Sequence, residues 1–134
     1  NASGATGPLI RLFNESLDLD AVRSMTVSVV VQGRDGFVMK ATSDMGQISR
    51  DPANLVQQLM GRHHQYPDGV MLMLGTMFAP IEDRDVPGMG FTHKLRDVVT
   101  IQSDELGSLV NVVRHSEECE PWEFGVGSLM RNLA

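Results

Sequence analysis

The chain has 134 residues, 42% of them hydrophobic, which suffices for one domain with one buried core. Its formal net charge of −6 argues against binding to nucleic acid or to an anionic membrane surface, because both require a basic face. The longest apolar run, Val70 to Leu74, is too short to span a bilayer, and the single cysteine, Cys119, excludes an internal disulfide framework. We therefore expect a small-molecule or protein partner and a cytoplasmic location, where a free thiol stays reduced.

The first residues, 1–7, are expected to form a flexible start. No basic stretch followed by an apolar one identifies a signal peptide. Asn1-Ala2-Ser3-Gly4 is typical of a cloning remnant or a cleavage site, and no initiator methionine is present. We therefore expect the native chain to be longer, with residues 1–134 forming a single domain.

The first predicted elements are the two strands of a hairpin. Residues 23–32 alternate loosely and are rich in β-branched side chains, which is typical of a strand. Gly33-Arg34-Asp35-Gly36 is a tight-turn signal, and residues 37–42 form the returning strand. Residues 23–42 are therefore predicted to be a β-hairpin.

A helix is predicted to follow the hairpin and to begin at Pro52. The Asp51 carboxylate can accept hydrogen bonds from the first free amides, and proline fits the first helical position, where no N–H is needed. Apolar residues then recur at helical spacing up to Met60. The helix is predicted to end at Gly61 or at Tyr66-Pro67.

Residues 69–74 form a continuous apolar run between turn signals, which indicates a strand buried on both faces. Residues 77–93 are rich in proline and glycine and are predicted to form a loop. A loop of this length inside a compact domain is often functional.

Two further strands are predicted at residues 97–102 and 109–113, joined around residues 104–107. Residues 122–133 are predicted to form a short C-terminal helix. Strands, one main helix and further strands in this order indicate an α+β fold with a mixed or antiparallel sheet.

Gly75-Thr76 follows the predicted buried strand directly and is the main candidate binding site. Glycine lets a ligand approach the backbone, and a hydroxyl at a strand end can bind a carboxylate or carbonyl oxygen. The alternative is a strand end with a capping threonine. Ligands often bind at the loops that follow strands, so the binding-site interpretation stays open beside this alternative.

The predicted loop carries three carboxylates and one arginine in Glu82-Asp83-Arg84-Asp85. Together with His93, Asp83 and Asp85 are candidate ligands for a divalent cation in a small metal-dependent enzyme. Adjacent loop residues converge only in a special turn, so the favoured interpretation is a solvated charge cluster whose members pair with one another.

The order of the segments resembles the C-terminal part of the fumarylacetoacetate hydrolase family. That family carries a Gly-Pro segment before a hairpin, an apolar strand ending in Gly-Thr, a Gly-Asp-x-Val strand and a Gly-x-Leu-x-Asn strand. The matching segments here are Gly7-Pro8, Tyr66 to Thr76, Pro80, Asp97 to Ile101 and Leu106 to Val113. The pattern is most similar to members that resemble sugar-acid dehydratases acting on 2-keto-3-deoxy acids.

The resemblance implies an α+β fold built on a mixed β-sheet roll, with one main helix and a short C-terminal helix. It also implies a divalent cation such as Mg²⁺ in the full-length parent, and a small 2-oxo or 1,3-dioxo acid as substrate. Thr76 matches the threonine that contacts the substrate carboxylate in the family. A homodimer is expected, because family members usually form dimers.

The sequence departs from the family pattern in several places. The family's metal-binding Glu-x-Glu and its catalytic His-x-x-Glu lie upstream of Gly-Pro, where this chain has only six residues. The family's lysine near Gly-Pro has no match here, and Arg96-Asp97 replaces Gly-Asp. No metal ligand and no catalytic residue are therefore assigned in this chain.

Two main hypotheses follow. In the first, the chain is the C-terminal part of a larger catalytic domain and is inactive alone, with no cofactor of its own. In the second, it is a non-catalytic scaffold or oligomerisation module whose exposed strand edges are covered by a partner chain.

Overall fold

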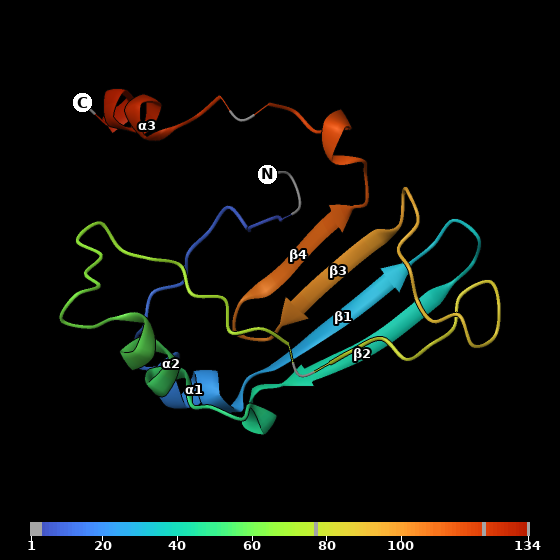
Figure 1. Cartoon of the computed structure of the whole chain (residues 1–134), viewed down its shortest axis with the longest axis horizontal. Helices are drawn as coiled ribbons and strands as arrows, with labels where there is room; N and C mark the ends of the chain where they lie inside the picture. The colour runs from blue at the N-terminus through green and yellow to red at the C-terminus, as the bar shows by residue number, and fades with distance from the viewer. Residues whose placement is uncertain (1–3, 77, 122, 134) are drawn as a thin grey trace.

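Four strands form one antiparallel sheet with the order β2-β1-β3-β4 in the computed structural model, which describes residues 4–76, 78–121 and 123–133. In Figure 1, helices α1 (Leu19–Ser24) and α2 (Pro52–Leu59) lie together beyond one end of the sheet. The strands are β1 (Thr26–Gln32), β2 (Val38–Asp44), β3 (Val98–Ser103) and β4 (Gly107–Val112). The helices are α1 (Leu19–Ser24), α2 (Pro52–Leu59) and α3 (Val126–Leu133), with short 3-10 turns η1 (Met45–Gln47) and η2 (Ser116–Glu118). The predicted α+β class is confirmed.

The sheet consists of two hairpins that pair through their inner strands. In the first hairpin Val31 lies opposite Met39, and in the second Val98 lies opposite Val112. The two hairpins join where β1 pairs antiparallel with β3, with Gln32 opposite Val98. Strands β2 and β4 form the two edges of this open sheet.

The predicted hairpin is confirmed, although its first strand begins later than expected. The Gly33 amide donates to the Phe37 carbonyl at 2.8 Å, and Gly36 adopts a positive φ of 83° that favours glycine in the turn. Arg23 and Ser24 instead belong to α1, a six-residue helix that the sequence did not predict. Asp18 caps α1 by accepting a hydrogen bond from the Ala21 amide at 2.8 Å.

The main helix, α2, begins at Pro52 as predicted. The Asp51 carboxylate accepts a hydrogen bond from the Ala53 amide at 2.8 Å, as expected for a capping residue. Asp51 also accepts a hydrogen bond from Arg23 at 2.5 Å, which ties α1 to the start of α2 and lowers the pKa of the Asp51 carboxyl. The helix ends at Leu59, before either predicted end.

The predicted strand at residues 69–74 is wrong, because this segment is irregular throughout. Gly69 and Gly75 both have positive φ, at 89° and 82°, so the chain turns at each end of the run. Met73 is 79% exposed, while Leu74 packs against the core. An apolar run indicates burial, but a strand also needs a neighbour to complete its hydrogen bonds, and no described strand pairs with this segment.

The buried core is small. One cluster consists of Leu17, Met25 and Met45, and the paired residues Val31 and Met39 are buried separately in the sheet. Along β2 the burial alternates, because successive side chains point to opposite faces of the sheet. Many large apolar side chains are nevertheless exposed, including Leu9, Ile10, Leu12, Phe13, Val70, Met71, Met73, Val110, Phe124 and Met130.

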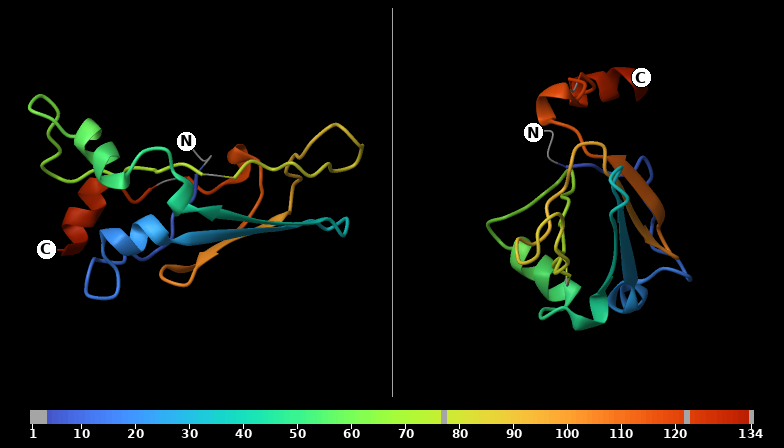
Figure 2. Two further views of the ribbon diagram at one scale, coloured as in Figure 1. Left: turned by 90° about the horizontal axis from the view of Figure 1, so that it is seen from below. Right: turned by 90° about the vertical axis from the view of Figure 1, so that its right-hand side faces the viewer.

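The predicted C-terminal helix is confirmed as α3, Val126–Leu133, which has no buried residue. Figure 2 shows that this helix lies apart from the sheet in both views.

Three of the predicted segments include residues that lie outside the described ranges. These are Trp122 at the start of the predicted helix, Met77 at the start of the predicted loop, and residues 1–3 of the predicted flexible start. Residues 78–93 contain no helix or strand, in agreement with the predicted loop.

Among the residues that the structure describes, no helix has the length and apolar character needed to cross a bilayer.

Candidate functional site

The predicted binding residues Gly75 and Thr76 lie beside the end of β2. The Thr76 hydroxyl donates to the Ser43 hydroxyl at 3.4 Å and accepts a hydrogen bond from the Phe78 amide at 3.2 Å. Ser43 is buried, whereas Gly75 and Thr76 are exposed. The bond to Ser43 is long, so the Thr76 hydroxyl proton can turn toward another acceptor at small cost.

The predicted self-paired charge cluster in the long loop is wrong. Arg84 is buried and reaches across to Asp97, which is also buried, with nitrogen–oxygen distances of 2.6 and 2.9 Å. These bonds from the guanidinium lower the pKa of the Asp97 carboxyl. The same guanidinium binds Asp35 in the β1–β2 turn at 3.0 Å, and its own pKa is raised by Asp97 first and then by Asp35.

The other members of that cluster have separate partners. The Asp83 carboxylate accepts hydrogen bonds from the Gly88 and Gly90 amides at 2.6 and 2.7 Å, which lower its pKa. The Asp85 carboxylate pairs with Lys94, whose pKa is raised by Asp85 and then by Asp35. The loop is thus fastened to the first hairpin by charge pairs that involve residues distant in the sequence.

Aromatic rings cover this network on one side. The Arg84 guanidinium lies over the Phe37 ring at 4.6 Å from its centroid. Phe37 stacks on Phe91 at 5.7 Å, and Phe91 meets the His93 ring edge-on at 4.8 Å. A guanidinium over an aromatic face is further stabilised by the ring's negative charge distribution. His93 therefore packs in an aromatic row, with its Nδ1 3.8 Å from an Asp97 oxygen.

The structure does not bring the candidate metal ligands of the loop together. Asp83 binds backbone amides and Asp85 binds Lys94, while His93 lies near Asp97. Within residues 4–76, 78–121 and 123–133, no three His, Cys, Asp or Glu side chains are grouped so that they could hold a metal ion.

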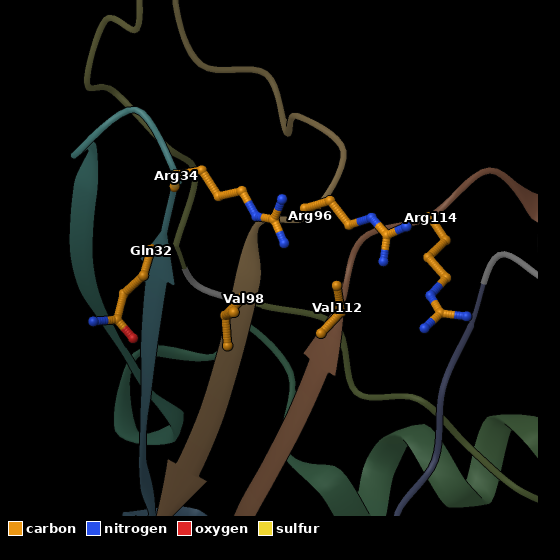
Figure 3. A pocket seen from close by; sticks show the side chains of 7 residues that line it. Gln32, Arg34, Arg96, Val98, Val112 and Arg114 are labelled. Atoms are coloured by element: carbon orange, nitrogen blue, oxygen red, sulfur yellow. The ribbon is translucent and has the colours of Figure 1, made fainter.

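A second candidate site, which the sequence did not reveal, is a hollow of about 420 Å³ at one end of the sheet. Arg34, Arg96 and Arg114 surround it, as Figure 3 shows. No local sequence signal reveals it, because the alignment of the three arginines depends on the strand register. Each arginine lies two residues beyond one member of the row Gln32, Val98 and Val112.

Arg96 has a positive φ of 73°, an uncommon conformation for a residue with a Cβ. Replacing Arg96 with glycine is expected to raise the free energy of unfolding by roughly 0.5 kcal/mol, because the relief of backbone strain exceeds glycine's extra entropy in the unfolded chain. Arg114→Gly is the matched control, since Arg114 lacks a positive φ and its replacement should destabilise. Urea unfolding of both variants checks this, and equal losses of stability would contradict it.

A second hollow, of about 650 Å³, is mostly apolar and lies between the N-terminal segment and the second hairpin. Residues 7–11 form one wall, and Val27, Ile101 and Leu109 lie on the sheet side. Its lining includes the Gly7-Pro8 segment that contributes to the family resemblance.

Comparisons of the chain with protein-family models, with curated proteins and with solved structures found no match in any of the three.

Proposed function

We propose that this chain is the C-terminal part of a fumarylacetoacetate-hydrolase-like metalloenzyme that acts on small 2-oxo or 1,3-dioxo acids, by hydrolysis, dehydration or isomerisation. The observation that carries the proposal is the backbone at two motif positions. Gly75, in the Gly-Thr motif, has a positive φ, and so does Arg96, which stands where the family pattern has the glycine of Gly-Asp. Left-handed backbone at the position of a motif glycine is what such a motif requires.

The exposed apolar surface supports the view that the domain is completed by other protein. Leu9 and Ile10 are 88% and 87% exposed, and they lie in the segment that follows Gly7-Pro8. Exposed apolar patches of this kind are typical of surfaces that another protein segment covers. Both edge strands, β2 and β4, could also extend the sheet toward the mixed β-roll of the family. A homodimer would cover further apolar surface.

Thr76 is the residue of this chain that would touch the substrate. Its oxygen is held by the Phe78 amide, so the hydroxyl keeps its position while its proton turns from Ser43 to a substrate carboxylate oxygen. This hydrogen bond would orient the substrate carboxylate without changing its charge. Metal binding and acid–base catalysis would be supplied by residues outside this chain.

The test is Thr76→Val in the full native chain, assayed with Mg²⁺ on a panel of 2-oxo acids. Loss of one hydrogen bond to a carboxylate should raise KM about tenfold or more. Thr42→Val is the matched control, because Thr42 is exposed on the opposite face of β2 and should leave KM unchanged. Absence of turnover on every 2-oxo and 1,3-dioxo acid in the panel would contradict the proposed activity.

A non-catalytic oligomerisation module is the second candidate, and the same exposed apolar surface favours it. The two candidates differ in the native chain. A mass well above 14.7 kDa, with an upstream His-x-x-Glu and Glu-x-Glu, supports the enzyme. A native chain of this length that self-associates in sedimentation supports the module.

A further inference from the structure

Three arginines lie in a row across one end of the sheet, and the strand register explains their alignment. Gln32, Val98 and Val112 are opposite one another on neighbouring strands. Arg34 follows Gln32 by two residues, Arg96 precedes Val98 by two, and Arg114 follows Val112 by two. The three strands end at one edge of the sheet, so the register carries the three arginines, which follow or precede the strands in turns and irregular chain, to the same end of the sheet.

Figure 3 shows the three side chains extending above Gln32, Val98 and Val112, with Arg34 directed toward Arg96 and Arg96 directed toward Arg114. Together with Gly33, these residues line the hollow of about 420 Å³. The hollow has a partly apolar floor, formed by the two valines, and a cationic rim. Neighbouring strands are about 4.8 Å apart, so the three backbone positions span roughly 10 Å.

The charges of this row are not neutralised by the described part of the chain. Arg23 and Arg84 form ion pairs with aspartates, whereas Arg34, Arg96 and Arg114 form no ion pair within residues 4–76, 78–121 and 123–133. The three guanidinium groups repel one another, even though the chain as a whole has a net charge of −6. A bound anion would remove this repulsion.

The backbone at Arg96 is a second, independent observation. The chain keeps an arginine at a φ of 73°, where glycine is favoured, and holds it there through a hydrogen bond from the Arg96 amide to the Val113 carbonyl at 2.9 Å. Strained backbone often persists at binding sites, where the surrounding structure compensates for it. A guanidinium at this position is thus retained at the expense of local stability.

We propose that this hollow binds a small oxyanion with two or more negative charges, a phosphate ester or diphosphate, or a polycarboxylate. Planar guanidinium groups bind both phosphate and carboxylate through paired N–H donors. A span of roughly 10 Å suits a ligand with two charged groups better than a single inorganic ion. The surface is small and the chain is acidic overall, which favours a small molecule over a nucleic acid.

The site is distinct from the Thr76 site. Thr76 contacts Ser43, which lies opposite Val27 at the other end of β1, roughly 17 Å along the strand from Gln32. Ser43 also lies on the opposite face of the sheet from the row Gln32, Val98 and Val112, because its partner Val27 differs from Gln32 by an odd number of residues. The inference therefore stands independently of the proposed enzyme activity.

The test is calorimetric titration of the full native chain, in low salt, with pyrophosphate and separately with citrate. The wild type should bind at least one of them saturably, with one site per chain. The double variant Arg34→Gln and Arg114→Gln should bind at least tenfold more weakly, with an unchanged circular dichroism spectrum because both side chains are exposed. Arg62→Gln is the matched control, since Arg62 is an exposed arginine far from the row in the sequence.

The outcomes separate the ligand sources. Binding of pyrophosphate alone assigns the site to phosphorylated ligands, and binding of citrate alone assigns it to polycarboxylates. Arg34→Lys should weaken binding although it keeps the charge, because lysine lacks the paired donors. No saturable binding of either anion, or an equal loss in Arg62→Gln, would overturn the inference.

Discussion

Replacement of Arg84 with methionine is expected to lower the free energy of unfolding by about 3 kcal/mol. The substitution removes one partner of a buried ion pair and leaves the Asp97 carboxylate, which is 1% exposed, without its guanidinium. Methionine retains much of the side-chain volume, so the loss reflects the missing charge and hydrogen bonds rather than a cavity. The loop would also lose its attachment to Asp35 in the β1–β2 turn.

Urea unfolding monitored by circular dichroism measures this effect, with Arg34→Met as the matched control. Arg34 is exposed and forms no ion pair within the described ranges, so its replacement should change stability by less than about 0.5 kcal/mol. The double variant Arg84→Met with Asp97→Asn should recover part of the loss, because no charge then stays buried without a partner. Equal stability of Arg84→Met and wild type would show that the buried pair is energetically neutral.

The second large effect is a loss of stability in acid that depends on Asp97. Arg84 lowers the pKa of the Asp97 carboxyl in the folded state, so the unfolded chain binds the proton more tightly. The stabilisation is therefore fully present above the unfolded pKa of about 4 and is lost as the pH falls through the folded pKa. The Asp35 carboxyl contributes to acid sensitivity in the same direction, because Arg84 and then Lys94 lower its pKa in the folded state.

The measurement is the free energy of unfolding of wild type and of Asp97→Asn at pH 6, 4 and 3. The wild type should be the more stable at pH 6, and the difference should shrink as the pH falls, since a protonated Asp97 resembles asparagine in charge. Asp104→Asn serves as control, because Asp104 lies in the β3–β4 turn away from Arg84. A difference that stays constant over this pH range would contradict the argument.

Elements held by local interactions were predictable from the sequence. The hairpin of β1 and β2 follows from β-branched residues on either side of a glycine-rich turn, and the start of α2 follows from Asp51-Pro52. These signals depend on residues within a few positions of one another. The short helix α1 was not predicted, although its cap at Asp18 is local, because six residues give too short an apolar pattern and the contact of Arg23 with Asp51 helps to hold them.

Features that depend on distant residues were not predictable. Arg84 finds its partners 13 and 49 residues away, so its sequence neighbours suggested the wrong pairing. The arginine row depends on the register between hairpins, which local patterns do not determine. The segment 69–74 was expected to be buried by its composition alone, although Val70 and Met73 are exposed in the described chain. The assignment of Thr76 to substrate binding stays a prediction.

The pairing of β1 with β3 has a consequence for the order of folding. Each hairpin closes over a short turn and can form within microseconds, whereas joining them requires closure of the long segment between Asp44 and Val98. Closing so long a segment carries a larger entropic cost, which makes the joining of the hairpins the slow step. The bridge from Arg84 to Asp35 divides that segment into shorter parts, so its early formation would accelerate folding.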